Sequence, residues 1–126
     1  MAEGIATLLG GGSRFEGKLG FDSPLRIDGV FRGLIQSDSV LVIGEGAEVE
    51  GQIAVATVIV RGGSLRGHVV ARDAIEVYAP ARVIGELHSP SVFLDKGVAF
   101  QGNCRMDAVS DGDIRALLEE YAGSTG

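Results

Sequence analysis

The sequence predicts an all-β fold, a parallel β-helix of about six turns, followed by a short C-terminal α-helix. A five-residue phrase, apolar–x–Gly–x–apolar, returns six times, with its glycines 16 to 18 residues apart. A second pair of apolar residues returns at nearly the same interval. In both phrases apolar residues alternate with others, which is the period of a strand because successive side chains point to opposite faces. A fixed internal period of this length indicates stacked repeats whose equivalent residues line up on successive turns.

The glycine phrase predicts a column of glycines between two inward-facing apolar columns. Each glycine has two explanations: it lies at a corner that needs positive φ, or it leaves room for the neighbouring turn. The glycines are Gly17, Gly33, Gly51, Gly67, Gly85 and Gly102; the residues before them are Phe15, Phe31, Val49, Leu65, Val83 and Phe100; the residues after them are Leu19, Ile35, Ile53, Val69, Leu87 and Cys104.

The second phrase predicts a further pair of inward columns on another side of the coil. Strand alternation places both members of each apolar pair on the inside. The same interval makes Thr7 and Leu9 an earlier member of the series. The pairs are Leu25/Ile27, Leu41/Ile43, Val58/Val60, Ile75/Val77 and Val92/Leu94.

Length and charge limit the classes of function. A chain of 126 residues forms one domain, and we expect a short head at 1–6, the β-helix at 7–106 and a tail at 107–126. The net charge of −6 argues against a nucleic-acid surface, which shows clustered Lys and Arg. The glycines at 10–12 are not followed by Lys-Ser/Thr, so they predict no nucleotide loop. Cys104 is the single cysteine and falls in an inward column, where we expect a small buried hydrophobe.

The head offers little for a membrane. It has no basic segment followed by an apolar run, so we expect no signal peptide, and no stretch is long enough to span a bilayer. Ile5, Leu8 and Leu9 could touch a membrane surface, but no Lys or Arg stands beside them to bind anionic lipid. The alternative for Leu9 is the first turn of the β-helix.

The tail predicts one amphipathic helix at 111–121. Ser110 can cap its start, and Gly123 is expected to end it. Three turns are too few for a stable isolated helix, so its apolar stripe must bury against something. That can be the flank or end of its own β-helix, or a partner such as a neighbouring subunit or a membrane enzyme. The stripe consists of Ile114, Leu117, Leu118 and Tyr121.

No residue pattern predicts catalysis, a cofactor or a metal. The two histidines, His68 and His88, fall on different turns and in different columns, so they do not form a zinc cluster. A γ-class carbonic anhydrase, another β-helix, needs three. The uneven intervals also exclude the strict six-residue repeat of β-helical acyltransferases. We therefore expect a protein that is not an enzyme.

Three stretches resemble the bactofilins, a family of bacterial cytoskeletal proteins: Leu25–Gly33, Val42–Ile53 and Leu94–Gly102. The resemblance implies a right-handed, three-sided β-helix that polymerises end to end without nucleotide. It further implies non-polar cytoplasmic filaments at the inner face of the cell membrane, which help to organise cell shape and peptidoglycan synthesis. Paralogous bactofilins and cell-wall enzymes would then be partners.

The ends of the rod carry the expected function. The first and last turns of a β-helix present open edges, which pair with other chains unless capped. Both ends are apolar here, and Phe100 is the strongest single candidate for a contact residue. Head-to-head and tail-to-tail contacts would alternate into a filament without polarity. The alternative is a non-polymerising β-helix that binds a cell-envelope enzyme or signalling protein. The predicted polymerisation residues are Leu8, Leu9 and Phe15 at one end and Val92, Leu94, Phe100, Cys104 and Met106 at the other.

Overall fold

The computed structural model of the chain describes residues 6–9, 12 and 14–125, with side chains described for 12 and 14–121. Within these residues, ten strands form one continuous sheet and are followed by one helix. The elements are β1 (Ala6–Leu9), β2 (Arg14–Phe21), β3 (Leu25–Ile27), β4 (Val30–Ser37), β5 (Val40–Ile43), β6 (Glu48–Arg61), β7 (Ser64–Tyr78), β8 (Arg82–His88), β9 (Val92–Leu94), β10 (Ala99–Arg105) and α1 (Asp111–Thr125).

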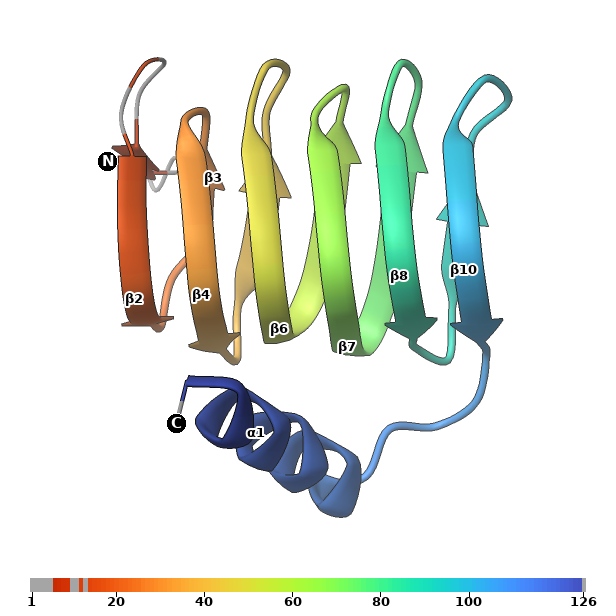
Figure 1. Ribbon diagram of the computed structural model, residues 1–126. Helices are drawn as coiled ribbons and strands as arrows, with labels where there is room; N and C mark the ends of the chain where they lie inside the picture. The colour runs from red at the N-terminus through yellow and green to blue at the C-terminus, as the bar shows by residue number, and fades with distance from the viewer. Residues whose placement is uncertain (1–5, 10–11, 13, 126) are drawn as a thin grey trace.

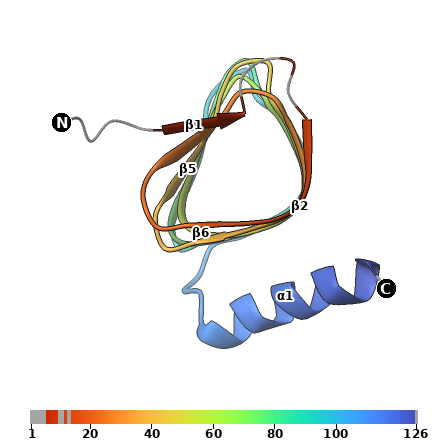
Figure 2. The same cartoon turned by 90° about the vertical axis from the view of Figure 1, so that its left-hand side faces the viewer.

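The strands wind into a three-sided parallel β-helix, as predicted. Every strand pairing is parallel. In Figure 1 the front strands run downward while the chain advances from β2 to β10, so the coil is right-handed. Figure 2 looks along the rod and shows the triangular outline of the stacked coils. Five successive pairings join the six strands that carry the glycine phrase, so the strands complete about five turns rather than six.

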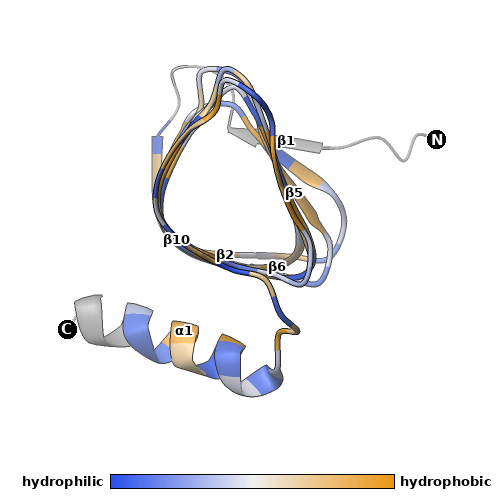
Figure 3. Cartoon of the chain, turned by 90° about the vertical axis from the view of Figure 1, so that its right-hand side faces the viewer, coloured by the Kyte–Doolittle hydropathy of each residue, from blue (hydrophilic) through white to orange (hydrophobic). Residues whose placement is uncertain are grey.

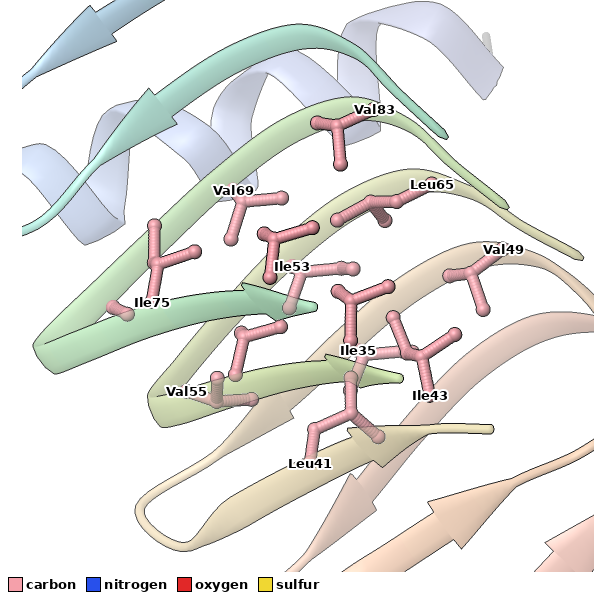
Figure 4. Close-up of a cluster of buried hydrophobic side chains, with 14 of the residues drawn as sticks. Ile35, Leu41, Ile43, Val49, Ile53, Val55, Leu65, Val69, Ile75 and Val83 are labelled. Atoms are coloured by element: carbon pink, nitrogen blue, oxygen red, sulfur yellow. The ribbon is translucent and has the colours of Figure 1, made fainter. Parts of the chain in front are cut away.

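The strand register confirms the columns expected from the sequence. Along the glycine phrase, Phe15 pairs with Phe31, and the series continues coil by coil to Phe100 opposite Val83. Along the second phrase, Leu25 begins a column that ends at Val92. Figure 4 shows members of these columns, among them Val49, Leu65 and Ile75, meeting inside the coil. Each fully buried Val, Ile or Leu contributes about 1.5–3 kcal/mol relative to an exposed one, so the stacked interior stabilises the fold.

The first strand departs from the expected register. Leu9 pairs with Ile27, as the sequence predicts, but Ala6 rather than Thr7 pairs with Leu25. An irregularity between Thr7 and Leu9 adds one residue there. A bulge of this kind is common at a sheet edge, where only one neighbouring strand imposes the register.

Both explanations of the glycine column hold. Its six members have φ between 135° and 144°, wide of the range that L side chains favour. A Cβ built on Gly51 would also lie 1.9 Å from the carbonyl oxygen of Gly33 on the preceding coil. Gly17 differs, because its coil has no described predecessor on that side and the closest atom to a Cβ would be a Phe15 ring carbon at 3.7 Å.

The helix α1 lies along one flank of the rod and leaves both ends uncovered (Figures 1 and 2). Ser110 caps it as predicted: its Oγ accepts the Asp113 backbone N–H at 3.2 Å, while the Asp113 carboxylate accepts the Ser110 N–H at 2.8 Å. The expected end at Gly123 is wrong, since the helix continues to Thr125. A glycine can adopt helical dihedrals, and its preference for helix ends does not force one.

Candidate polymerisation surfaces

The C-terminal end of the rod exposes the interior columns of the coil. Val83 and Leu87, in β8, are 1% and 2% exposed. Their partners on the next coil are Phe100, which is half-buried, and Cys104, which is exposed. The alternation that points a side chain inward is the same in both coils, but no described coil follows β10. The inward-pointing side chains of the last coil are therefore uncovered on the side that faces the end of the rod.

The second phrase ends in the same way. Val92 and Leu94 lie beside the fully buried Ile75 and Val77 of the preceding coil. Val92 is half-buried and packs against the core, while Leu94 is 36% exposed. Met106, just after β10, is 60% exposed. All five residues predicted for this end are therefore at least partly accessible, and together with Phe93 they make up the C-terminal tip.

The expectation of a buried Cys104 is wrong. The thiol is exposed, although its inward direction and its place in the Leu87 column are as predicted. Burial needs a neighbouring coil on each side, and Cys104 has one on a single side. The partial burial that remains raises the pKa of the Cys104 thiol.

Phe93 adds to the C-terminal tip and was not identified from the sequence. It lies between the inward pair Val92 and Leu94, so it points outward and is 47% exposed. Its ring packs on that of Tyr78, with centroids 5.4 Å apart. The sequence signal was an aromatic residue at an outward position of the last coil, where a polar residue is the ordinary choice.

The N-terminal end is built from the same columns. Phe15 stacks on Phe31 with ring centroids 5.3 Å apart and planes 12° apart. Phe15, Leu19 and Phe21 are half-buried and pack against the core. The side chains of Leu8 and Leu9 lie outside the described residues.

Each end also has strands that are paired on one side only. Among the described strands, β10 pairs with β8 alone and β9 with β7 alone. At the other end, β2 pairs with β4 alone and β1 with β3 alone. The unpaired edge of each strand presents backbone N–H and C=O groups to another chain. Apolar side chains and open strand edges thus occur together at both ends.

Charged groups border the C-terminal tip. The guanidinium Nε of Arg105 donates to the Asp107 carboxylate at 2.8 Å, and His88 Nε2 lies 2.5 Å from its other oxygen. The Arg105 hydrogen bond is the main cause that lowers the pKa of Asp107. These groups tie the segment after β10 to the preceding coil beside the tip, leaving Phe100 and Cys104 uncovered.

The apolar stripe of α1 faces its own β-helix. Ile114 and Leu117 are buried against Ala54 and Val70 on the outer surface of the coil, and Leu118 packs beside them. Tyr121 is half-buried, with the Lys18 ammonium 5.9 Å from its ring centroid. Of the two predicted locations, the flank of its own chain is the one this structure shows.

The structure brings neither histidine to a metal-like cluster. His68 Nδ1 lies 3.1 Å from Glu120 Oε1, whereas His88 contacts Asp107. Across the described part of the chain, no three His, Cys, Asp or Glu side chains gather as metal ligands would. No helix within that part has both the length and the hydropathy needed to cross a bilayer.

Comparisons with known proteins point to one family. A family model described as "Bactofilin: Polymer-forming cytoskeletal" matches residues 7–105. Bactofilin BacO of Myxococcus xanthus (strain DK1622) is 32% identical over 102 residues, which cover 80% of this chain and 79% of BacO. Bactofilin BacP of the same strain is 26% identical over 110 residues, 87% of this chain but 45% of BacP. No solved structure matches the chain. The family match covers the whole β-helix, and the chain therefore belongs to the bactofilins, the polymer-forming cytoskeletal family.

Proposed function

We propose that this bactofilin assembles end to end, without nucleotide, into non-polar filaments that act as a scaffold for cell shape or cell-wall synthesis. One observation carries the proposal: the interior columns run to the last coil and are left accessible there, beside strands with an open edge. Joining two such tips would bury Phe100, Leu94 and Cys104 and pair the free backbone groups of β10. Both effects favour association.

Head-to-head and tail-to-tail contacts are the arrangement that we propose for these ends. Each tip would meet its own copy in an isologous contact, so the same residues are buried on both sides of it. Because a rod has two different tips, alternating the two contacts gives an open chain without polarity. A paralogous bactofilin with the same columns could be incorporated into that chain. Cytoplasmic filaments at the inner face of the membrane, and the recruitment of cell-wall enzymes, belong to the same proposal.

Phe100→Arg tests the proposal. Its matched control is Gln101→Arg, which places the same charge on the neighbouring outward position of β10. Negative-stain microscopy and sedimentation should show filaments for the unmodified chain and for the control, but short soluble oligomers for Phe100→Arg. Circular dichroism confirms that each variant is folded. Long filaments of a folded Phe100→Arg protein would refute assembly through this tip.

The alternative, a non-polymerising scaffold that binds an envelope protein, gives a different result in the same experiment. The unmodified chain would then sediment as one discrete particle whose size does not change with concentration. That outcome would overturn the proposed polymer and favour the scaffold.

A further inference from the structure

The contact between α1 and the β-helix is separate from the interior of the coil. Ile114 and Leu117 form their own buried cluster with Ala54 and Val70, and none of these four belongs to the main core. Figure 3 shows α1 lying beneath one side of the coil, outside the stacked strands. The β-helix thus keeps its interior whether or not α1 is in place.

Contacts between acidic and basic side chains surround this small apolar contact. Arg72 Nη2 lies 3.4 Å from Asp111 Oδ1, at the start of the helix. Near its other end, His68 lies 3.1 Å from Glu120. The linker that leads into α1 is held by His88 on Asp107. In each pair the basic side chain belongs to the β-helix and the acidic one to the C-terminal segment, and both histidines of the chain take part.

Two further charged side chains lie near the histidines, and neither changes the arrangement of basic residues on the β-helix and acidic residues on the C-terminal segment. Glu86, on the coil beside His68, lies 3.9 Å from its Nδ1, and Arg105 shares Asp107 with His88. The face beneath α1 is thus an apolar centre with a basic rim, and we call it the flank face: Lys18, Ala54, His68, Val70, Arg72 and His88. Lys18 and Arg72 give it a positive charge that is complementary to an acidic amphipathic helix, and the two histidines lie within hydrogen-bond distance of carboxylates of the C-terminal segment.

The helix is held weakly enough to leave the flank face. A helix of this length is marginal in water without tertiary contacts. Polar contacts between exposed side chains add little stability, and the Arg72–Asp111 and His68–Glu120 contacts are partly or largely exposed. Two buried apolar side chains supply most of the remaining stabilisation. Opening and closing of α1 therefore need not disturb the rod.

We propose that the flank face is a docking site for an acidic amphipathic helix, filled by α1 of the same chain in the single molecule and by α1 of a second copy in the polymer. This inference rests on the proposed self-assembly, which brings many copies of both the helix and the face together. An identical chain carries the same Ile114, Leu117 and acidic side chains, so the exchanged contact repeats the one seen here. Such exchange is a low-cost way to join protomers.

The linker is long enough for the exchange along the rod. Residues 106–110 connect β10 to α1, and five residues reach at most about 17 Å. Asp111 lies beside Arg72 in β7, which is two coil spacings, or about 10 Å, from β10. If two C-terminal tips abut, Arg72 of the neighbouring copy lies three coil spacings from β10, or about 14 Å. The helix of one copy can therefore start on either chain.

Cross-linking of two single-cysteine chains tests the proposal, with Cys104→Ser in every chain. One chain carries Arg72→Cys and a size tag, the other carries Asp111→Cys, and the mixed polymer is treated with a short bismaleimide. We expect a cross-linked heterodimer at several times the yield of a control pair in which Asp38→Cys, at an exposed turn, replaces Arg72→Cys. Adding Leu117→Glu to the helix-bearing chain should lower the yield to that of the control.

A heterodimer yield equal to the control would overturn the exchange. A single chain with both Arg72→Cys and Asp111→Cys would then cross-link only within itself, which shows α1 docked on its own chain alone. Electron microscopy of the same sample separates this result from failure of the proposed function. Filaments without heterodimer overturn the exchange and leave the polymer intact, whereas the absence of both filaments and heterodimer overturns both proposals.

Discussion

The coil that contains β8 and the coil that contains β10 have the same pattern of inward residues but differ in exposure. Val83 and Leu87 are almost fully buried, while Phe100 and Cys104, their partners one coil later, remain accessible. The direction in which a side chain points is set by its own strand, but its burial depends on the neighbouring coils. An inward side chain is fully covered only when a coil lies on each side of it. An end coil therefore has one uncovered apolar surface, and a second copy of the chain can cover it.

The largest effect expected from this comparison concerns the glycine column. In Gly51→Ala the new Cβ would lie 1.9 Å from a backbone oxygen of the preceding coil, and φ is 135°. We expect a loss of about 4 kcal/mol or more in the free energy of unfolding, since a backbone atom has nowhere to move. Gly17→Ala meets no backbone atom within 4 Å and should lose only about 1–3 kcal/mol, from its φ alone. Urea unfolding of both variants measures the difference, and equal losses would contradict the role of the preceding coil.

The next effect compares two residues of one column. Leu87→Ala empties a fully buried position and should lower the free energy of unfolding by about 2–5 kcal/mol. Cys104→Ala, one coil later, should change it by less than about 0.5 kcal/mol in the unassembled protein, because the exposed side chain leaves no cavity. Both values come from urea unfolding at a concentration too low for assembly. A large loss for Cys104→Ala would show that this end is already covered in the single molecule.

A smaller effect is expected in the reactivity of the Cys104 thiol, which lies in the same end coil. Cys104 is the only cysteine, so its reaction with a maleimide follows the C-terminal tip without further engineering. We expect the reaction to slow by about tenfold when filaments form, since a neighbour would cover the thiol. Dilution that disperses the filaments should restore the faster rate. A reaction rate that stays the same through assembly would place the contact elsewhere on the rod.

The columns could be predicted from the sequence because the repeat period, counted along the chain, tells which residues lie side by side on neighbouring coils. The partners of Phe15, Leu41 and Val60 follow from counting residues alone, as does the column of glycines. Open apolar end coils are expected from the same count, but the exposure of the individual side chains there is not, and the expected burial of Cys104 is wrong. Counting shows that a residue points inward but not whether another coil covers it.

The docking of the tail could be predicted only in part. The stripe with Ile114 and Leu117 indicated that α1 must bury a face, and the flank was one of two locations considered. The partners of His68 and His88 could not be found from the sequence. The positions of Glu120 and Asp107 depend on the course of the linker after β10, which strand pairing does not determine. Contacts between repeats are periodic, while contacts between the tail and the rod are not.

The smallest effect concerns the flank that α1 covers, in contrast to the tip that it leaves open. The backbone N–H of Ser110, followed by its hydroxyl, lowers the pKa of the Asp113 carboxyl. A lowered pKa means that the charged carboxylate stabilises the folded helix above the ordinary pKa, and this stabilisation is lost as pH falls through the lowered value. We therefore expect the helical circular dichroism signal to weaken below about pH 4, and Asp113→Asn to show a weaker signal at neutral pH with less further loss on acidification. Since strand pairing and the C-terminal tip make no use of Asp113, the strand signal should be the same in the variant, and filaments should still form at neutral pH. Loss of all filaments in Asp113→Asn at neutral pH would contradict assembly through the tips themselves and would mean that the exchanged α1 is required for the end contact.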